Sequence, residues 1–237
     1  YTGSPTNMKV LIIILGTWVL CPIIAGLIAM FFYTLTKKFI HSSKLHILRL
    51  DAYTRAALVL AGAFGAYSLG ANNIANVMGV FVPISPFTDV NIMNIFIFSS
   101  KEQLFLLGGI AISVGVFTYS KRVMFTIGND LLKMSPIAAF IVVVSHSIVL
   151  FLFASQGISN FLQSINLPPI PLVPVSSSQA VVGGVIGIGL LKGGKEVRWS
   201  IAGKICLGWF TLPVIAAFMS FIILFILQNI FNLTVNI

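Results

Sequence analysis

The sequence has little charge, and almost none of it is negative. Only 8% of the 237 residues are charged, and five Asp and Glu residues stand against fourteen Lys and Arg residues. A soluble domain carries about 25% charged residues, so this composition does not suit a protein surrounded by water. The five carboxylates fall between the apolar runs, which leaves paired-carboxylate catalysis without a site inside them. We therefore do not expect an enzyme.

Cysteine is scarce as well. Cys21 and Cys206 both lie in apolar runs, and neither belongs to a C-x-x-C or Cys–His pattern. The usual sequence frameworks of disulfides and zinc sites are therefore missing. The P-loop pattern G-x-x-x-x-G-K-[ST] is missing too, which argues against ATP-driven pumping. We expect buried thiols and no cofactor.

Long hydrophobic runs dominate what is present. Hydrophobic residues make up 58% of the chain, in continuous rather than alternating runs. A membrane-spanning helix requires about 20 mostly apolar residues, whereas barrel strands alternate. We predict an all-α polytopic protein of the cell membrane. Its six embedded segments are expected near residues 10–36, 56–82, 103–120, 135–155, 174–191 and 205–230.

The basic residues are distributed unevenly between these segments. Twelve of the fourteen Lys and Arg residues lie in 37–55, 121–133 and 192–204, which fall on one side if the chain enters the first segment from outside. This asymmetry is the positive-inside pattern, so these stretches are expected to be cytoplasmic. The net charge of +9 thus indicates contact with membrane lipids and not with nucleic acid.

Two distant segments share a pattern. Aligned at one constant offset, Trp18 and Pro22 match Trp209 and Pro213. The positions of the basic loops indicate that these two segments cross the membrane in opposite directions. Inverted repeats of this kind are typical of secondary transporters. We expect residues 1–50 to hold the last helix of a first repeat and a basic cytoplasmic linker, and 51–237 to form the second repeat. The rest of the first repeat would come from residues upstream of Tyr1 or from another chain.

An unusually polar stretch, GAYSLGANNIANVMG at 65–79, lies inside the second segment. Asn72, Asn73 and Asn76 are spaced to share nearly one face of a helix. Small residues and amides could serve close packing between helices. We favour a second interpretation, a broken helix whose carbonyls and amides bind a cation and a substrate.

A second polar stretch, PVSSSQAVVGGVIGIGLLKG at 174–193, follows the proline-rich LPPIPLVP. Pro174 suits the approach to a helix, and Ser176 or a neighbour can cap it. The unpaired N–H groups at a helix start favour an anion, and Ser176, Ser177 and Ser178 add hydroxyl donors. Two polar stretches in an apolar chain predict a binding site near the membrane midplane.

These stretches resemble the inorganic phosphate transporter (PiT) family. GANNIANVMG at 70–79 is similar to its GANDVANAxG signature, and the 174–193 stretch to its PVSTTHxxVGxxxGxG segment. The resemblance covers about 56–231 and the tail of the other repeat at 9–36. It implies phosphate uptake coupled to sodium or protons, an inverted-repeat fold with re-entrant helices, and a homodimer. Alternating access would move the broken-helix elements against 10–36 and 205–230.

The resemblance also assigns candidate site residues. Substrate binding falls to Ser176, Ser177, Ser178, Gln179, Asn72 and Asn73, and the coupling-cation site to Asn73 and Asn76. Two positions depart from the family pattern: Asn73 replaces an Asp and Gln179 replaces a His. The lost carboxylate leaves the identity of the cation open. Sulfate or another tetrahedral oxyanion, and a non-transporting scaffold or receptor, remain alternatives. His146, between two serines, is expected to be a packing residue and not a proton relay.

Overall fold

Long helices make up most of the protein. The computed structural model describes residues 8–43, 46–92, 96–125, 128 and 131–231, except the side chains of residues 75, 76, 92 and 123. Within that part of the chain, five helices are long and apolar enough to cross a membrane. They confirm the predicted all-α polytopic architecture and are α1 (Met8–Ser43), α2 (Ile47–Met78), α3 (Ser100–Phe125), α4 (Pro136–Ala154) and α7 (Trp199–Asn229).

The sixth apolar helix, α6 (Ser177–Leu191), is shorter. Its 15 residues extend about 22 Å, which is less than the roughly 30 Å of a membrane core. Residues 167–176 ahead of it have no regular secondary structure, as the proline-rich sequence predicts. Helix α6 therefore begins part-way through the protein, at the predicted polar stretch.

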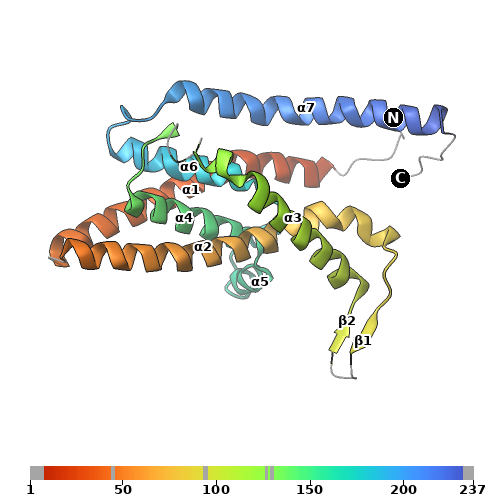
Figure 1. Cartoon of the computed structure of the whole chain (residues 1–237), viewed down its shortest axis with the longest axis horizontal. Helices are drawn as coiled ribbons and strands as arrows, with labels where there is room; N and C mark the ends of the chain where they lie inside the picture. Colours follow the sequence, from red (N-terminus) through yellow and green to blue (C-terminus); the bar gives the residue numbers. More distant parts are fainter. Residues whose placement is uncertain (1–7, 44–45, 93–95, 126–127, 129–130, 232–237) are drawn as a thin grey trace.

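Three small elements lie outside the long helices, and the first of them forms most of its turn within the predicted embedded segment 56–82. They are the 3-10 helix η1 (Gly79–Ile84), an antiparallel hairpin of β1 (Val90–Ile92) and β2 (Phe96–Phe98), and α5 (Gln156–Ser164). The hairpin is tied to the start of α3, because Asp89 accepts a hydrogen bond from the Ser100 N–H and Gln103 donates to the Thr88 carbonyl. It projects from the helices at the lower right of Figure 1.

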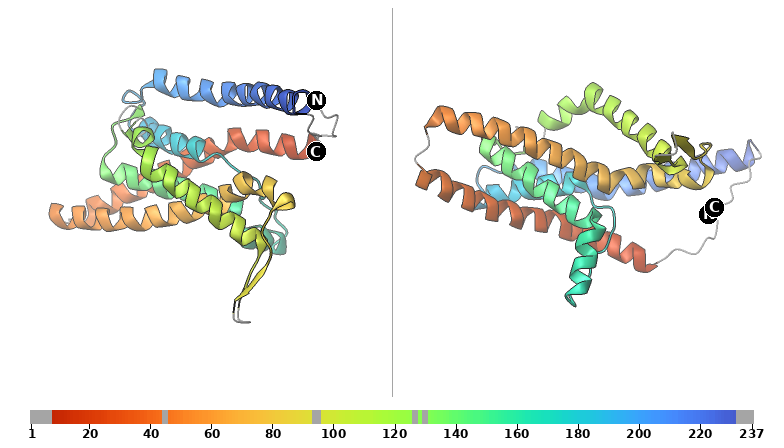
Figure 2. Two further views of the ribbon diagram at one scale, coloured as in Figure 1. Left: turned by 45° about the vertical axis from the view of Figure 1, so that its right-hand side comes forward. Right: turned by 90° about the horizontal axis from the view of Figure 1, so that it is seen from below.

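Helix α6 lies at the centre of the helix packing. It contacts α1 and α4, and α4 in turn packs against α2 (Figures 1 and 2). The shared apolar core is fully buried and includes Ala29 of α1, Ile141 and Val142 of α4, and Val185 and Ile188 of α6. The start of α6 is fixed by a second core cluster, in which Val175 and Ala180 pack with residues of α1 and α4.

A seam of small residues brings α1 and α6 into backbone contact. A Cβ atom on Gly183 would collide with the backbone of Pro22, and one on Gly187 would collide with that of Gly26. Side chains at these positions would force the helices apart, so glycine is required for this approach. These two glycines therefore allow the close approach of α1 and α6.

The basic stretches gather at one end of the molecule. The turn from α1 to α2, the start of α4 and the connection from α6 to α7 lie together on the left in Figure 1. The stretch 37–55, expected to be a loop, is mostly helical, because α1 continues to Ser43 and α2 begins at Ile47. With 36 residues, α1 is about 54 Å long, enough to carry its charged end beyond an apolar core.

Candidate anion site

The start of α6 presents several hydrogen-bond donors. Ser176 is the N-cap, and its Oγ accepts from the Gln179 N–H at 3.4 Å and lies 3.0 Å from the Ser178 Oγ. The backbone N–H groups of Ser177 and Ser178 form no hydrogen bond within the described part of the chain. Unpaired N–H groups and the helix dipole both favour a negative charge here. The predicted cap is confirmed.

Gln179 holds an unsatisfied acceptor at the same helix start. The sequence Ser-Ser-Ser-Gln fits a capping box, in which the Gln side chain would accept from the N–H of the cap residue. Only the serine half of that box is formed. The Gln179 Oε1 atom is buried and makes no hydrogen bond in the described structure, although the residue is only 5% exposed. A buried acceptor without a donor is costly, so this atom requires a donor that the described part of the chain does not supply.

Asn72 joins the two polar stretches. Its Oδ1 accepts a hydrogen bond of 3.0 Å from the N–H of Val175, 103 residues further along the chain. Asn72 is only 6% exposed, and Val175 is buried as well. This bond satisfies a backbone donor just before the cap, where no helix bond is available. Asn72 therefore positions the start of α6.

Asn73 and Asn76, the other two asparagines of the polar stretch in α2, do not lie at a break in the helix. Helix α2 is continuous through Met78, so the break expected within 65–79 occurs only at its end, where η1 begins at Gly79. The Asn73 Nδ2 donates to the Leu69 carbonyl of its own helix at 3.3 Å. Because the amide bonds the preceding turn, it does not require an unwound backbone. Asn76 lies in α2, but its side chain is outside the described residues.

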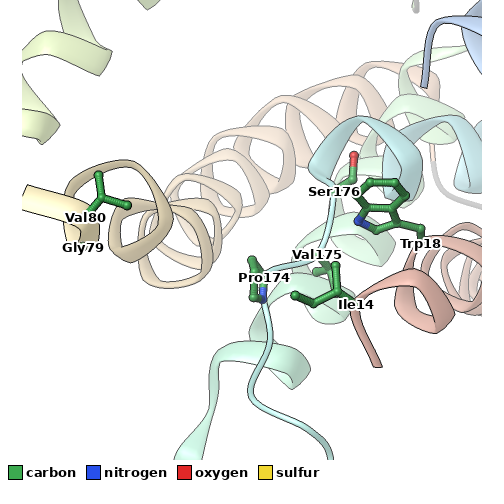
Figure 3. A pocket seen from close by; sticks show the side chains of 7 residues that line it. All are labelled: Ile14, Trp18, Gly79, Val80, Pro174, Val175 and Ser176. Atoms are coloured by element: carbon green, nitrogen blue, oxygen red, sulfur yellow. The ribbon is translucent and has the colours of Figure 1, made fainter. Parts of the chain in front are cut away.

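A cavity of about 620 Å³ opens beside the start of α6. Figure 3 shows the Ser176 hydroxyl beside the indole of Trp18, with Pro174, Val175 and Ile14 below them and the start of η1 opposite. Of the predicted site residues, Ser176 is the one that lines this cavity. Asn72 is joined to the site through Val175, whereas no described contact brings Asn73 to the serines.

Helix α1 contributes two residues that the sequence did not assign to the site. Trp18 lines the cavity, and the Cys21 thiol lies 3.6 Å from the Ser176 carbonyl, to which it can donate. The sequence carried a signal for Trp18, because it belongs to the Trp-x-x-x-Pro pattern that identified the repeat, whereas Cys21 occupies a variable position of that pattern. Cys21 is fully buried, as predicted, whereas Cys206 in α7 is only partly buried, so the expectation of two buried thiols was wrong for Cys206.

Other candidate chemistries find less support. Ser145 and Ser147 beside His146 donate to carbonyls one turn back in α4, at 2.7 and 2.6 Å. Both serines thus serve their own helix, which agrees with a packing role for this segment. Among the described residues there is no group of three or more His, Cys, Asp or Glu side chains that could hold a metal ion.

Comparison with known proteins decides the family. The family model described as the phosphate transporter family matches residues 2–159 and 172–236. The chain belongs to this phosphate transporter family. Asn72 lies in the first matched part, and the start of α6 lies in the second. With five helices able to cross a membrane, this member of the phosphate transporter family is a multi-pass membrane protein.

Several relatives within the phosphate transporter family cover much of the chain. It is 30% identical to a protein of Methanocaldococcus jannaschii named as a phosphate permease, over 93% of this chain and 62% of the relative. It is 26% identical to a phosphate permease so named from Thermococcus kodakarensis, over 84% of this chain and 45% of that protein. The human sodium-dependent phosphate transporter 1 is 26% identical over 66% of this chain and 21% of its own length.

The chain is thus similar to part of these relatives, spanning 62% or less of their length. No solved structure matches it.

Proposed function

We propose that this chain forms part of a transporter that moves inorganic phosphate across the membrane. The observation that carries the proposal is the start of α6. There, three serine hydroxyls and unpaired N–H groups lie together, and Asn72 fixes the irregular stretch that leads to them. Backbone N–H groups at a helix start bind oxyanions well. The Ser176, Ser177 and Ser178 hydroxyls add donors suited to a tetrahedral anion.

Gln179 favours phosphate over sulfate. Its buried Oε1 requires a hydrogen-bond donor. Monohydrogen and dihydrogen phosphate carry a P–OH group that can donate, whereas sulfate at neutral pH has only acceptor oxygens. A site that pairs unpaired N–H groups with one buried acceptor therefore discriminates between the two anions. Sulfate remains the second candidate, because the serine hydroxyls alone would accept it.

Coupling to a cation gives the transport its direction. Hydroxyls and amides bind an anion equally well from either side, so a sodium or proton gradient is needed to drive uptake. Asn73 and Asn76 are our candidates for contacting the cation, since amide oxygens are hard donors that suit Na⁺. The name of the human relative, sodium-dependent phosphate transporter 1, makes sodium the first ion to test.

The complete transporter would contain two related sites. The Trp-x-x-x-Pro pattern in α1 and α7 supports an inverted repeat, with residues 1–50 ending the first copy and 51–237 forming the second. The resemblance to the phosphate transporter family implies that the complete transporter is a homodimer. Alternating access would then expose the start of α6 to each side in turn.

Uptake of radiolabelled phosphate into proteoliposomes tests the proposal. The double variant Ser177→Ala, Ser178→Ala removes two hydroxyls and leaves the N-cap Ser176 in place. We expect uptake to fall at least about ten-fold, because each lost hydrogen bond to a charged ligand costs about 1.5–3 kcal/mol. The control is Ser113→Ala in α3, whose hydroxyl donates to its own helix at Gly109.

Three outcomes would contradict parts of the proposal. Normal phosphate uptake by the double serine variant would remove α6 from the site. Counterflow of labelled sulfate at the rate of phosphate would make the protein a general oxyanion transporter. Correctly folded protein that carries neither anion, under a sodium or a proton gradient, would favour a scaffold or receptor.

A further inference from the structure

Two neighbouring cavities of opposite character lie at the basic end of α1. The first measures about 300 Å³ and is lined by Tyr33, Lys37, Ile40, His41, Ser135 and Ile137. The second, of about 440 Å³, lies between α1, α2 and α4, and its walls include Phe39, Leu50 and Phe140. Ile40 and Ile137 line both cavities, so the two share a wall.

The first cavity is cationic. Tyr33, Lys37 and His41 follow one another at intervals of four residues, which aligns them on one face of α1. Its lining contains no carboxylate. The ion pairs of the described chain are Asp51–Arg55 and Lys192–Glu196, so the charge of Lys37 is not neutralised there.

The second cavity is effectively apolar. Two of its hydroxyls are already satisfied by the backbone of their own helices, since Thr54 donates to Leu50 and Ser43 donates to Ile40. The rest of the wall consists mainly of aliphatic and aromatic side chains. An apolar space of this kind gives little to a soluble anion but suits a hydrocarbon chain.

The pair of cavities lies far from the candidate anion site. Lys37 follows Trp18 by 19 residues on the same helix, which places it about 28 Å away along α1. It belongs to the end where the basic segments gather, the end that the positive-inside pattern assigns to the cytoplasm. Anionic lipid headgroups are found at this depth on that side of a membrane.

We propose that the two cavities together bind one anionic phospholipid. Its headgroup phosphate contacts Lys37, His41 and the hydroxyls of Tyr33 and Ser135, and one acyl chain enters the apolar cavity beyond Ile40. A second copy of this chain fits the charge less well. Its described carboxylates are already engaged: Asp51 and Glu196 in ion pairs, and Asp89 and Glu102 by N–H groups of their own loop.

Native mass spectrometry of the purified protein tests this site with two probes. Phosphatidylglycerol and phosphatidylcholine with identical acyl chains differ in headgroup charge alone. We expect the protein to retain phosphatidylglycerol preferentially, and Lys37→Gln to lower that retention about five-fold, as expected for one basic residue at an anionic lipid. Lys37→Arg should keep it. Lys38→Gln is the matched control, because Lys38 adjoins Lys37 but lines neither cavity.

A second variant tests the apolar half. Ala57 lines the second cavity, so Ala57→Phe fills it and should lower retention of both phospholipids. In the unmodified protein, free glycerol phosphate lacks an acyl chain and should not displace bound phosphatidylglycerol. Equal retention by Lys37→Gln and the unmodified protein would overturn the proposal. So would an equal loss in Lys38→Gln, which would indicate diffuse charge attraction. Displacement of phosphatidylglycerol by glycerol phosphate or inorganic phosphate would assign the cavity to a soluble anion instead.

Discussion

Helices α6 and α7 follow one another in the chain and are similarly apolar, yet the protein uses them differently. Most of α6 is buried, including four of its glycines, and its start carries the candidate anion site. In α7, the described helix buries one residue, Ala202, and exposes large side chains such as Phe210 and Phe218. Apolar composition alone therefore does not separate a central helix from a peripheral one.

The glycines account for much of the difference. Gly183 and Gly187 of α6 touch the backbone of α1, whereas a Cβ atom on Gly203 or Gly208 of α7 would meet no atom within 4 Å. Close backbone approach increases dispersion contacts, which are the main source of helix association inside a membrane. Helix α6 is held through backbone contacts with α1, whereas the large side chains of α7 are exposed in this structure.

The largest effect is expected from comparing a glycine substitution in α6 with the same substitution in α7. Gly183→Val should drive α1 from α6 and lower the free energy of unfolding by more than about 3 kcal/mol, because the added atoms overlap the Pro22 backbone. Gly208→Val should change it by less than about 0.5 kcal/mol. Thermal unfolding in detergent measures both. Similar losses in the two variants would show that α7 is packed as tightly as α6.

An intermediate effect is expected from an asparagine pair. Asn72→Ala leaves the buried Val175 N–H without its acceptor, which should cost about 1–3 kcal/mol and reduce phosphate uptake. Asn229→Ala in α7 removes an exposed bond to the carbonyl of Phe225, so stability and uptake should stay unchanged. Unfolding curves measure the stability of each variant, and proteoliposome assays measure its phosphate uptake. Undiminished uptake in Asn72→Ala would remove this residue from the positioning of α6.

The smallest change in stability, with a large change in function, is expected at Gln179. Gln179→Leu removes a buried acceptor that has no protein partner, so stability should stay within about 1 kcal/mol or improve. Uptake of phosphate should fall about ten-fold, since the ligand loses one acceptor. Thr211→Val in α7 is the control, because that hydroxyl bonds its own helix. A marked loss of stability would instead show that Gln179 is a packing residue.

The local features of the site could be predicted from the sequence. Proline fixes the backbone of the approach to α6, and serine at the cap satisfies a nearby N–H, so both effects depend on adjacent residues. The long apolar runs likewise predicted the membrane helices. Their ends were less certain, and α1 continues through Lys37 and Lys38 because lysine is a good helix former.

The contacts between distant residues could not be predicted in the same way. The bond from Val175 to Asn72 depends on how α2, α4 and α6 pack, which no local pattern specifies. The break expected in 65–79 was wrong for a related reason: an amide in a helix can bond the turn before it, as Asn73 does with Leu69. Polarity in an apolar segment does not by itself require an unwound backbone.

The glycine seam between α1 and α6 also restricts how this protein can move. Two helices in direct backbone contact at Gly26, Gly183 and Gly187 cannot slide or tilt past one another without a collision. We therefore expect α1 and α6 to move together, against the expectation from the resemblance that the start of α6 moves relative to 10–36. If transport opens the serine-rich helix start to the other side of the membrane, as we propose, the chain would have to bend elsewhere, and the irregular stretch 167–176 is the nearest candidate.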